Sequence, residues 1–239
     1  MSSSGESPNP IIVALDERNG SDAVRLAKSL RPHVGGFKVG LELIMGVGPA
    51  MVGAIADLGL PVFADAKLHD IPNTVERAAR HLGSVGARWV TVHGSGGREM
   101  VAAAEEGLAS STGDRPGGIL VVTVLTSIDS TRLASVGMGS SVGKQVARLS
   151  RIANEVGVEG VVCSVREVGD VAQVAPDLVR VVPGIRPAGA DHHDQASVAT
   201  PEEALARGAD WLVIGRAITR APDPIAAAES ITADLHYVT

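Results

Sequence analysis

Residues 63–74 read Phe63-Ala64-Asp65-Ala66-Lys67-Leu68-His69-Asp70-Ile71-Pro72-Asn73-Thr74. The segment begins as an apolar run, becomes charged, and then reaches a proline that suits the first turn of a helix. Asn73 and Glu76 have the spacing of a capping box, with Asn in place of the usual Ser or Thr. A strand, a charged loop and a helix in this order form one unit of an α/β fold.

The same unit recurs along the chain. Eight short runs are predicted as strands, and their apolar character is continuous, as is typical of a parallel sheet that is buried on both faces. These runs are Ile11–Leu15, Gly36–Val39, Val62–Ala64, Trp89–Val92, Ile119–Val124, Gly160–Val162, Val179–Val182 and Trp211–Ile214.

Helical segments separate the predicted strands. Amphipathic patterns predict helices at, for example, Asp22–Leu30, Thr74–Val85 and Pro201–Arg207. Glycine suits the left-handed turn that follows a helix end. Such glycines precede four of the strands: Gly59, Gly86, Gly157 and Gly208.

Two segments echo each other, because Gly86-Ala87-Arg88-Trp89-Val90-Thr91-Val92 resembles Gly208-Ala209-Asp210-Trp211-Leu212-Val213-Ile214. They are the fourth and eighth predicted strands. Eight strand–helix units in a chain of 239 residues predict a single-domain (β/α)8 TIM barrel over residues 11–239, after a disordered tail at residues 1–10. The alternative is an open doubly wound sheet, which the lack of a glycine-rich dinucleotide fingerprint after the first strand disfavours.

Composition narrows the class of protein. The net charge of -6 disfavours nucleic acid as a partner, and the one cysteine, Cys163, excludes an internal disulfide and suits a reducing compartment. No apolar run approaches the ~20 residues of a membrane span, and the first residues lack the layout of a signal peptide. We therefore expect a cytoplasmic protein that binds neither membrane nor nucleic acid.

The active site of such a barrel lies at the carboxyl ends of its strands. Polar residues gather directly after the predicted strands: Asp16, Lys38, Asp65 with Lys67, His93, Thr126, Ser164, Pro183-Gly184-Ile185-Arg186 and Gly215-Arg216. For any one of them alone, the alternative is an ordinary loop residue, and for Asp16 or Lys38 alone this alternative is favoured. We assign a packing role to His93, and a surface position to His192 and His193.

The loops after the seventh and eighth predicted strands have the residue types of a phosphate-binding site. Gly184 and Arg186 follow the seventh strand, and Gly215 and Arg216 follow the eighth. Loops 7 and 8 form the recurrent phosphate site of barrels, where glycine lets backbone N–H groups approach and arginine adds a charged contact. The polar segment 187–197 is interpreted as a lid over this phosphate.

The order Asp65, Lys67, Asp70 indicates one kind of reaction, a proton transfer. A lysine held charged between carboxylates donates a proton well and is a poor nucleophile, which favours protonation of a carbanion. The alternative is structural, with Asp70 at a helix start and Lys67 merely paired with Asp65. The local sequence leaves both interpretations open.

A family resemblance favours the chemical interpretation. The motif Asp65-x-Lys67-x-x-Asp70-Ile71-Pro72-Asn73-Thr74 resembles the signature of the orotidine 5′-phosphate decarboxylase family. The other predicted strand ends resemble that family in the same order: Ala14-Leu15-Asp16, Gly36-Phe37-Lys38-Val39-Gly40, Val92-His93-Gly94, Val124-Leu125-Thr126-Ser127, Val182-Pro183-Gly184-Ile185-Arg186 and Val213-Ile214-Gly215-Arg216-Ala217-Ile218.

The resemblance implies decarboxylation of orotidine 5′-monophosphate (OMP) to uridine 5′-monophosphate (UMP), with no cofactor and no metal, in pyrimidine synthesis. It implies a homodimer in which Asp65 and Lys67 of one subunit meet Asp70, Ile71 and Thr74 of the other, with Lys67 protonating C6. It assigns the remaining contacts to Asp16 and Lys38 (ribose), Thr126 beside Ser127 (pyrimidine), Gln195, Gly215 and Arg216 (phosphate), and Pro183 and Arg186 (substrate).

Two rival functions remain. The first is a metal-dependent phosphosugar enzyme of the same barrel group, such as 3-keto-L-gulonate 6-phosphate decarboxylase or hexulose-phosphate synthase. The second is a non-catalytic nucleotide-binding protein, which the presence of Asp65, Lys67 and Asp70 together disfavours.

Overall fold

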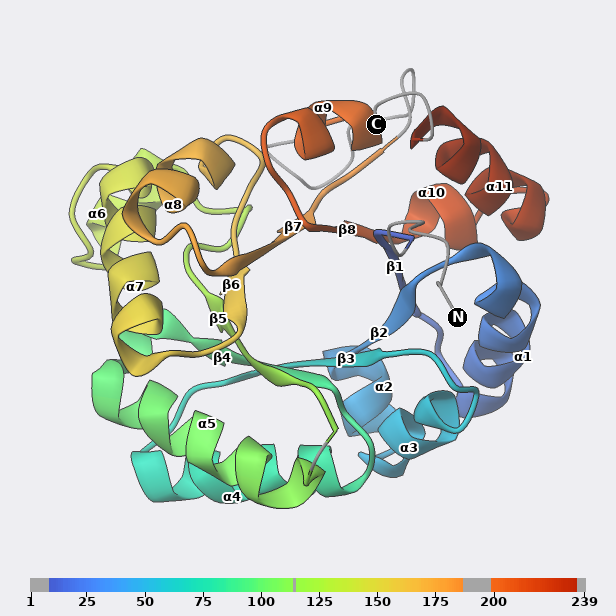
Figure 1. Ribbon diagram of the computed structural model, residues 1–239, viewed down its shortest axis with the longest axis horizontal. Helices are drawn as coiled ribbons and strands as arrows, with labels where there is room; N and C mark the ends of the chain where they lie inside the picture. Colours follow the sequence, from blue (N-terminus) through green and yellow to red (C-terminus); the bar gives the residue numbers. More distant parts are fainter. Residues whose placement is uncertain (1–8, 114, 187–198, 236–239) are drawn as a thin grey trace, which may run out of the picture.

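Eight parallel strands close into a barrel in the computed structural model, which describes residues 9–113, 115–186 and 199–235. Each strand pairs with the next along the chain, and β1 pairs with β8 (Figure 1). This closure confirms the predicted (β/α)8 TIM barrel and excludes the open sheet. The strands are β1 (Ile11–Ala14), β2 (Gly36–Gly40), β3 (Val62–Leu68), β4 (Trp89–His93), β5 (Gly118–Val122), β6 (Gly160–Val162), β7 (Val179–Pro183) and β8 (Trp211–Ile214).

Helices surround the barrel as an outer ring (Figure 1). The α-helices are α1 (Gly20–Leu30), α2 (Leu41–Gly46), α3 (Ala50–Ala56), α4 (Pro72–Ser84), α5 (Arg98–Thr112), α6 (Ser130–Ser135), α7 (Val142–Val156), α8 (Val168–Val174), α9 (Pro201–Ala206), α10 (Arg216–Thr219) and α11 (Pro224–Leu235). Two short 3-10 helices, η1 (Arg31–His33) and η2 (Gly94–Gly96), complete the described elements. The four predicted helix-end glycines all have positive φ angles.

Several boundaries differ from the prediction. Helix α4 begins at Pro72, with Ile71 at the cap position and no capping side chain, so the capping box at Asn73 was wrong. Proline starts this helix unaided because its fixed φ suits the first turn and its missing N–H needs no partner. Strand β3 continues to Leu68, and β5 ends at Val122.

The amino-terminal boundary also moves. Asn9, which we assigned to the tail, donates a hydrogen bond to the carbonyl of His33 (2.9 Å) and accepts one from the N–H of Ile11 (3.0 Å). The carbonyl of Pro10 accepts from the N–H of Leu212. The barrel therefore begins by Asn9; residues 1–8 lie outside the described ranges.

The core has two parts. The larger one packs the outer face of the strands against the helices. The smaller one fills the barrel interior and includes Ile12, Phe63, Trp89, Leu120 and Val181. Trp89 and Trp211, the tryptophans of the two echoing segments, meet edge to face with ring centroids 5.3 Å apart, an arrangement that aromatic pairs prefer.

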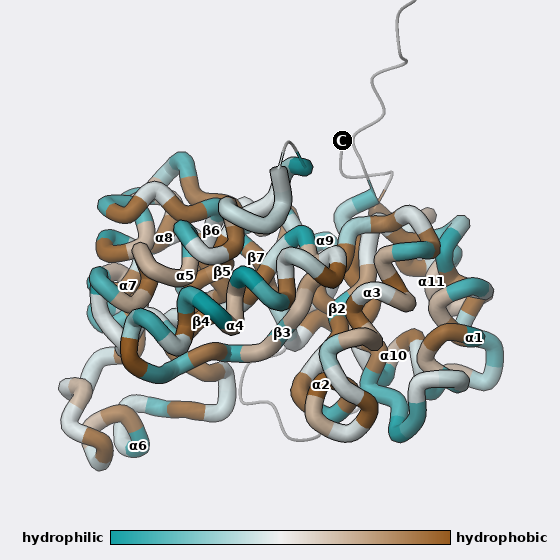
Figure 2. Tube along the Cα trace, turned by 90° about the horizontal axis from the view of Figure 1, so that it is seen from below, coloured by the Kyte–Doolittle hydropathy of each residue, from teal (hydrophilic) through white to brown (hydrophobic). Residues whose placement is uncertain are grey.

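The loops that follow the strands shape one end of the barrel. Figure 2 shows α2 and α6, which follow β2 and β5, projecting from the same end of the molecule. Among the described helices, none combines the length and apolar character required to span a membrane.

Candidate active site

A cavity of about 280 Å³ opens at the carboxyl ends of the strands. Nine of the predicted site residues line it, from β2, β3 and β7 or from segments that follow β1, β5, β7 and β8: Asp16, Lys38, Asp65, Lys67, Thr126, Pro183, Arg186, Gly215 and Arg216. The closed barrel brings these residues together although they span 200 positions of the sequence. Gln195, also predicted, lies outside the described residues.

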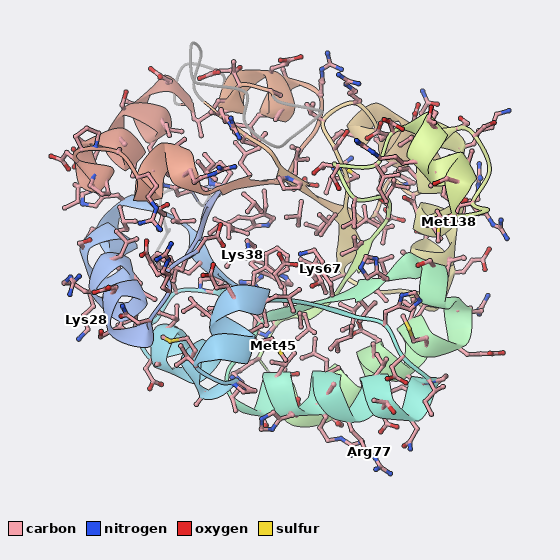
Figure 3. All side chains as sticks on the ribbon, turned by 180° about the vertical axis from the view of Figure 1, so that it is seen from behind. Lys28, Lys38, Met45, Lys67, Arg77 and Met138 are labelled. Atoms are coloured by element: carbon pink, nitrogen blue, oxygen red, sulfur yellow. The ribbon has the colours of Figure 1, made fainter. Side chains whose placement is uncertain are left out.

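Four of these side chains form a chain of alternating charge. The Lys67 ammonium lies 2.6 Å from Oδ1 of Asp65, and the Lys38 ammonium lies 3.3 Å from Oδ2 of the same carboxylate. Lys38 also lies 3.6 Å from Oδ1 of Asp16. Figure 3 shows Lys38 and Lys67 side by side at the centre of the barrel. Alternation lets each charge in the array face a partner of opposite sign.

Asp65 is the centre of this array. Its side chain is only 11% exposed, and burial on its own raises the pKa of a carboxyl group. The ammonium groups of Lys38 and Lys67, with hydrogen bonds from Lys67 and Thr91, outweigh the burial and hold the pKa of Asp65 below its usual value. Asp65 is therefore a carboxylate at neutral pH.

Lys67 has an unusual backbone. Its φ is +47°, which makes it the one non-glycine residue with positive φ in the described ranges. It lies in a bulge, because Ala64 aligns with Val90 whereas Leu68 aligns with Val92. A left-handed conformation costs a non-glycine residue on the order of 1–3 kcal/mol, and such outliers cluster at functional sites. The bulge directs the Lys67 side chain into the cavity beside Asp65.

Thr91 is a neighbour of the site that sequence reasoning missed. Its buried hydroxyl accepts a hydrogen bond from the N–H of Lys67 (2.9 Å) and donates one to Oδ1 of Asp65 (3.1 Å). Threonine suits a strand, so we treated Thr91 as part of a continuous apolar run. The sequence did contain one indication: Thr91 places a hydroxyl in this strand, whereas the similar segment 208–214 has Val213 at the corresponding position.

Three predicted residues do not line this cavity. Asp70, Ile71 and Thr74 are exposed, and Ile71 is exposed by 66%. The Asp70 carboxylate accepts a hydrogen bond from the N–H of Ile71 (2.6 Å). In a single chain, Asp70 therefore lies just before α4 and makes no ion pair with Lys67 among the described contacts.

The predicted phosphate loops adjoin each other. Gly184 and Arg186, after β7, line the same part of the molecule as Gly215 and Arg216, after β8, because β7 and β8 are paired. Gly184 has a φ of +82°, which only glycine adopts without strain. A Cβ at Gly215 would lie 3.5 Å from the Asp16 carboxylate, so the bare backbone keeps this wall of the cavity open.

The remaining predicted polar residues lie nearby. His93 is partly buried, and its ring lies 5.5 Å from that of His69. Burial, followed by electrostatic interactions with His69 and Lys67, lowers the pKa of His93. Ser164 is buried and donates a hydrogen bond to Glu167. Within residues 9–113, 115–186 and 199–235, no group of three or more His, Cys, Asp or Glu side chains is placed to hold a metal ion.

Apolar side chains form the other cavity wall, and we had not predicted them. Val122, Leu125, Val162 and Val213 lie at strand ends and face the opening. Such residues cannot be told from core residues in the sequence, because the two share the same strand pattern.

Comparison with known proteins decides the family. Residues 9–231 match the model of the orotidine 5′-phosphate decarboxylase / HUMPS family. The chain belongs to this family. It is 51% identical over 226 residues to orotidine 5′-phosphate decarboxylase of Anaeromyxobacter sp. (strain K), with 94% of this chain and 97% of the relative covered. It is 49% identical over 228 residues to the enzyme of the same name from Thermobifida fusca (strain YX), with 95% of each chain covered.

Solved structures of the orotidine 5′-phosphate decarboxylase family have the same architecture. The crystal structure of the Lactobacillus acidophilus enzyme matches with a TM-score of 0.83 and 36% identity, covering 95% of this chain and 98% of that one. The Pyrococcus horikoshii OT3 enzyme matches with a TM-score of 0.75 and 28% identity, covering 95% and 99%. The family resemblance predicted from the motifs is thus confirmed over nearly the whole chain.

Proposed function

We propose that this protein is an orotidine 5′-phosphate decarboxylase, a carboxy-lyase that converts OMP to UMP and carbon dioxide in pyrimidine biosynthesis. The observation that carries the proposal is the array Asp16–Lys38–Asp65–Lys67 at the mouth of the cavity. Near-complete coverage of relatives with this name, at 42–51% identity, supports the same reaction. The single cysteine, buried Cys163, fits the cytoplasm.

The proposed reaction uses the Lys67 ammonium as the proton donor. The bond between C6 and the carboxylate breaks, carbon dioxide leaves, and the electron pair stays on C6. C6 then takes a proton from Lys67, whose amine recovers a proton from solvent. Preorganised charges in a site sheltered from water stabilise such a carbanion without reorganising during the reaction. We propose that the enzyme needs no metal and no organic cofactor for this step.

The other site residues bind the substrate in this proposal. Asp16 and Lys38 hold the ribose hydroxyls, and Thr126 contacts the pyrimidine. The phosphate is bound by the loops after β7 and β8, through Pro183, Arg186, Gly215, Arg216 and Gln195. Binding energy from the remote phosphate lowers the barrier when it is realised in the transition state.

We further propose a homodimer with shared active sites. Four apolar side chains in or beside α2 and just before α4 are exposed, in segments that follow the neighbouring strands β2 and β3: Leu41 by 47%, Met45 by 79%, Val47 by 46% and Ile71 by 66%. Figure 3 shows Met45 on α2. Clustered exposed apolar residues mark interaction surfaces. Asp70, Ile71 and Thr74 lie on this surface, where a second copy would receive them beside its own Lys67.

The experiment is a decarboxylation assay on OMP in excess EDTA, followed by the loss of orotate absorbance. Full turnover with chelator supports the proposal. Loss of turnover in EDTA with recovery on adding a divalent metal would contradict the metal-free reaction proposed here. Tight UMP binding without any turnover of OMP would support the non-catalytic nucleotide-binding protein.

A further inference from the structure

The hydroxyl of Thr91 connects the two halves of the Asp65–Lys67 pair. It accepts a hydrogen bond from the backbone N–H of Lys67 and donates one to Oδ1 of Asp65. That same oxygen pairs with the Lys67 ammonium at 2.6 Å. The contacts therefore close a ring that runs from the Lys67 backbone through Thr91 and Asp65 back to the Lys67 side chain.

The bulge in β3 explains why the ring is needed. Residues 65–67 of β3 lie opposite Thr91 alone, since Ala64 aligns with Val90 and Leu68 with Val92. A bulge leaves an extra residue without its ladder partner. The Thr91 hydroxyl supplies that partner for the N–H of Lys67, whose φ of +47° takes it out of the regular strand geometry.

Thr91 itself does not line the cavity. Its side chain is fully buried beneath the site, where substrate cannot reach it. The echoing strand β8 has Val213 at the matching position, in the apolar interior cluster. An apolar side chain of this size is thus acceptable inside the barrel, and the hydroxyl on β4 calls for a reason other than packing.

We propose that Thr91 is a positioning residue for the decarboxylation. Its hydroxyl fixes where the Lys67 ammonium stands relative to the Asp65 carboxylate, and hence relative to the carbon that receives the proton. The inference rests on the proposed role of Lys67 as proton donor. Displacing a reacting group by about 1 Å costs on the order of 100-fold in rate. Loss of a hydroxyl outside the cavity can therefore lower kcat by shifting the Lys67 ammonium.

The test compares three variants. Thr91→Val keeps the shape and removes the hydroxyl, whereas Thr91→Ser keeps the hydroxyl. Thr123→Val is the matched control, because the buried Thr123 hydroxyl donates to the carbonyl of Val162 (2.8 Å) and touches neither Asp65 nor Lys67. Each variant is assayed for kcat and KM with OMP, for UMP affinity by calorimetry and for Tm.

We expect kcat of Thr91→Val to fall by roughly 10- to 100-fold. KM and UMP affinity should stay within about threefold, because ribose and phosphate contacts come from other strands. Thr91→Ser should recover most of kcat, and Thr123→Val should keep it. If Thr91→Val does not fold, Thr91→Ala replaces it with the same expected loss.

Three results would overturn the inference: full kcat in Thr91→Val, equal loss in the Val and Ser variants, or equal loss in Thr123→Val. Lys67→Ala is measured alongside. If Lys67→Ala is inactive while Thr91→Val is fully active, only the positioning inference fails. If Lys67→Ala retains full activity, the proton-donor proposal fails instead, whatever the Thr91 variants do.

Discussion

At the scale of single residues, the environment of Lys67 decides what the site can do. Its side chain is 29% exposed, and its ammonium pairs with the Asp65 carboxylate, which also pairs with Lys38. Removing Lys67 would leave the Asp65 carboxylate with one cation instead of two, but the residues proposed to bind ribose and phosphate would stay. Under this proposal different residues carry proton transfer and substrate binding, which makes the two separable by mutation.

Lys67→Ala should lower kcat by at least about 100-fold, the lower end of the range for loss of a general acid. UMP binding should remain, because Asp16, Lys38 and the phosphate loops are unchanged. Steady-state kinetics on OMP and calorimetry with UMP check this. Lys28→Ala, on the exposed side of α1, is the control and should behave as wild type. A Lys67→Ala protein with more than a tenth of wild-type kcat would refute the proton-donor role.

His93 should make stability depend on pH near neutrality. Burial, His69 and Lys67 depress its pKa below 6.5 in the fold, with Asp65 opposing them. As pH falls below 6.5, the unfolded chain binds a proton that the folded one does not, so stability is lost on acidification. His93→Gln should therefore lose less unfolding free energy between about pH 7 and pH 5 than wild type. Urea unfolding at fixed protein concentration measures this, and equal losses would contradict it.

At the scale of elements, the strands were predictable and their ends were not. Continuous apolar runs located all eight strands, because both faces of each strand are buried. The bulge in β3 could not be predicted, because the sequence after Ala64 fits equally well a strand that ends there and one that continues past Lys67. The role of Thr91 was hidden with it, because its partners are set by that bulge.

The start of α4 shows a second limit. Pro72 fits a helix start, but the capping-box spacing of Asn73 and Glu76 favoured Asn73 as the cap. The structure uses Pro72 at the first turn instead. This leaves Asp70 and Ile71 outside the helix and exposed, where one chain gives them no partner in the cavity. Sequence reasoning from the residues alone found the charged motif, whereas the proposal that two subunits share it came only from the family resemblance.

Gly184 tests the loop after β7. Its φ of +82° is a region that costs other residues about 1–2 kcal/mol. Gly184→Ala should lose about that much unfolding free energy and raise KM, because Gly184 lines the cavity. Gly169→Ala is the matched control, in α8 with ordinary φ and open space around its Cβ position. It should gain up to about 1 kcal/mol. An unchanged KM and stability in Gly184→Ala would contradict this view of the loop.

At the scale of the whole molecule, the barrel explains how scattered residues make one site. Closure of β1 on β8 brings Asp16 beside the phosphate loops, and β2 and β3 place Lys38 against Asp65. Helix α2 follows β2 and Ile71 follows β3, so their exposed apolar side chains lie at the same end of the barrel as the cavity. A second copy that covers them would shelter the cavity and deliver Asp70, so assembly and catalysis would depend on each other.

Mixing inactive Lys67→Ala chains with inactive Asp70→Ala chains tests this shared site most directly. In a symmetric dimer, each hybrid carries one site that lacks both residues and one that is intact. Random exchange should therefore restore about a quarter of wild-type activity, measured on OMP after mass spectrometry confirms the hybrids. If confirmed hybrids stay inactive, Asp70 does not serve the partner's Lys67, and the shared-site account is wrong.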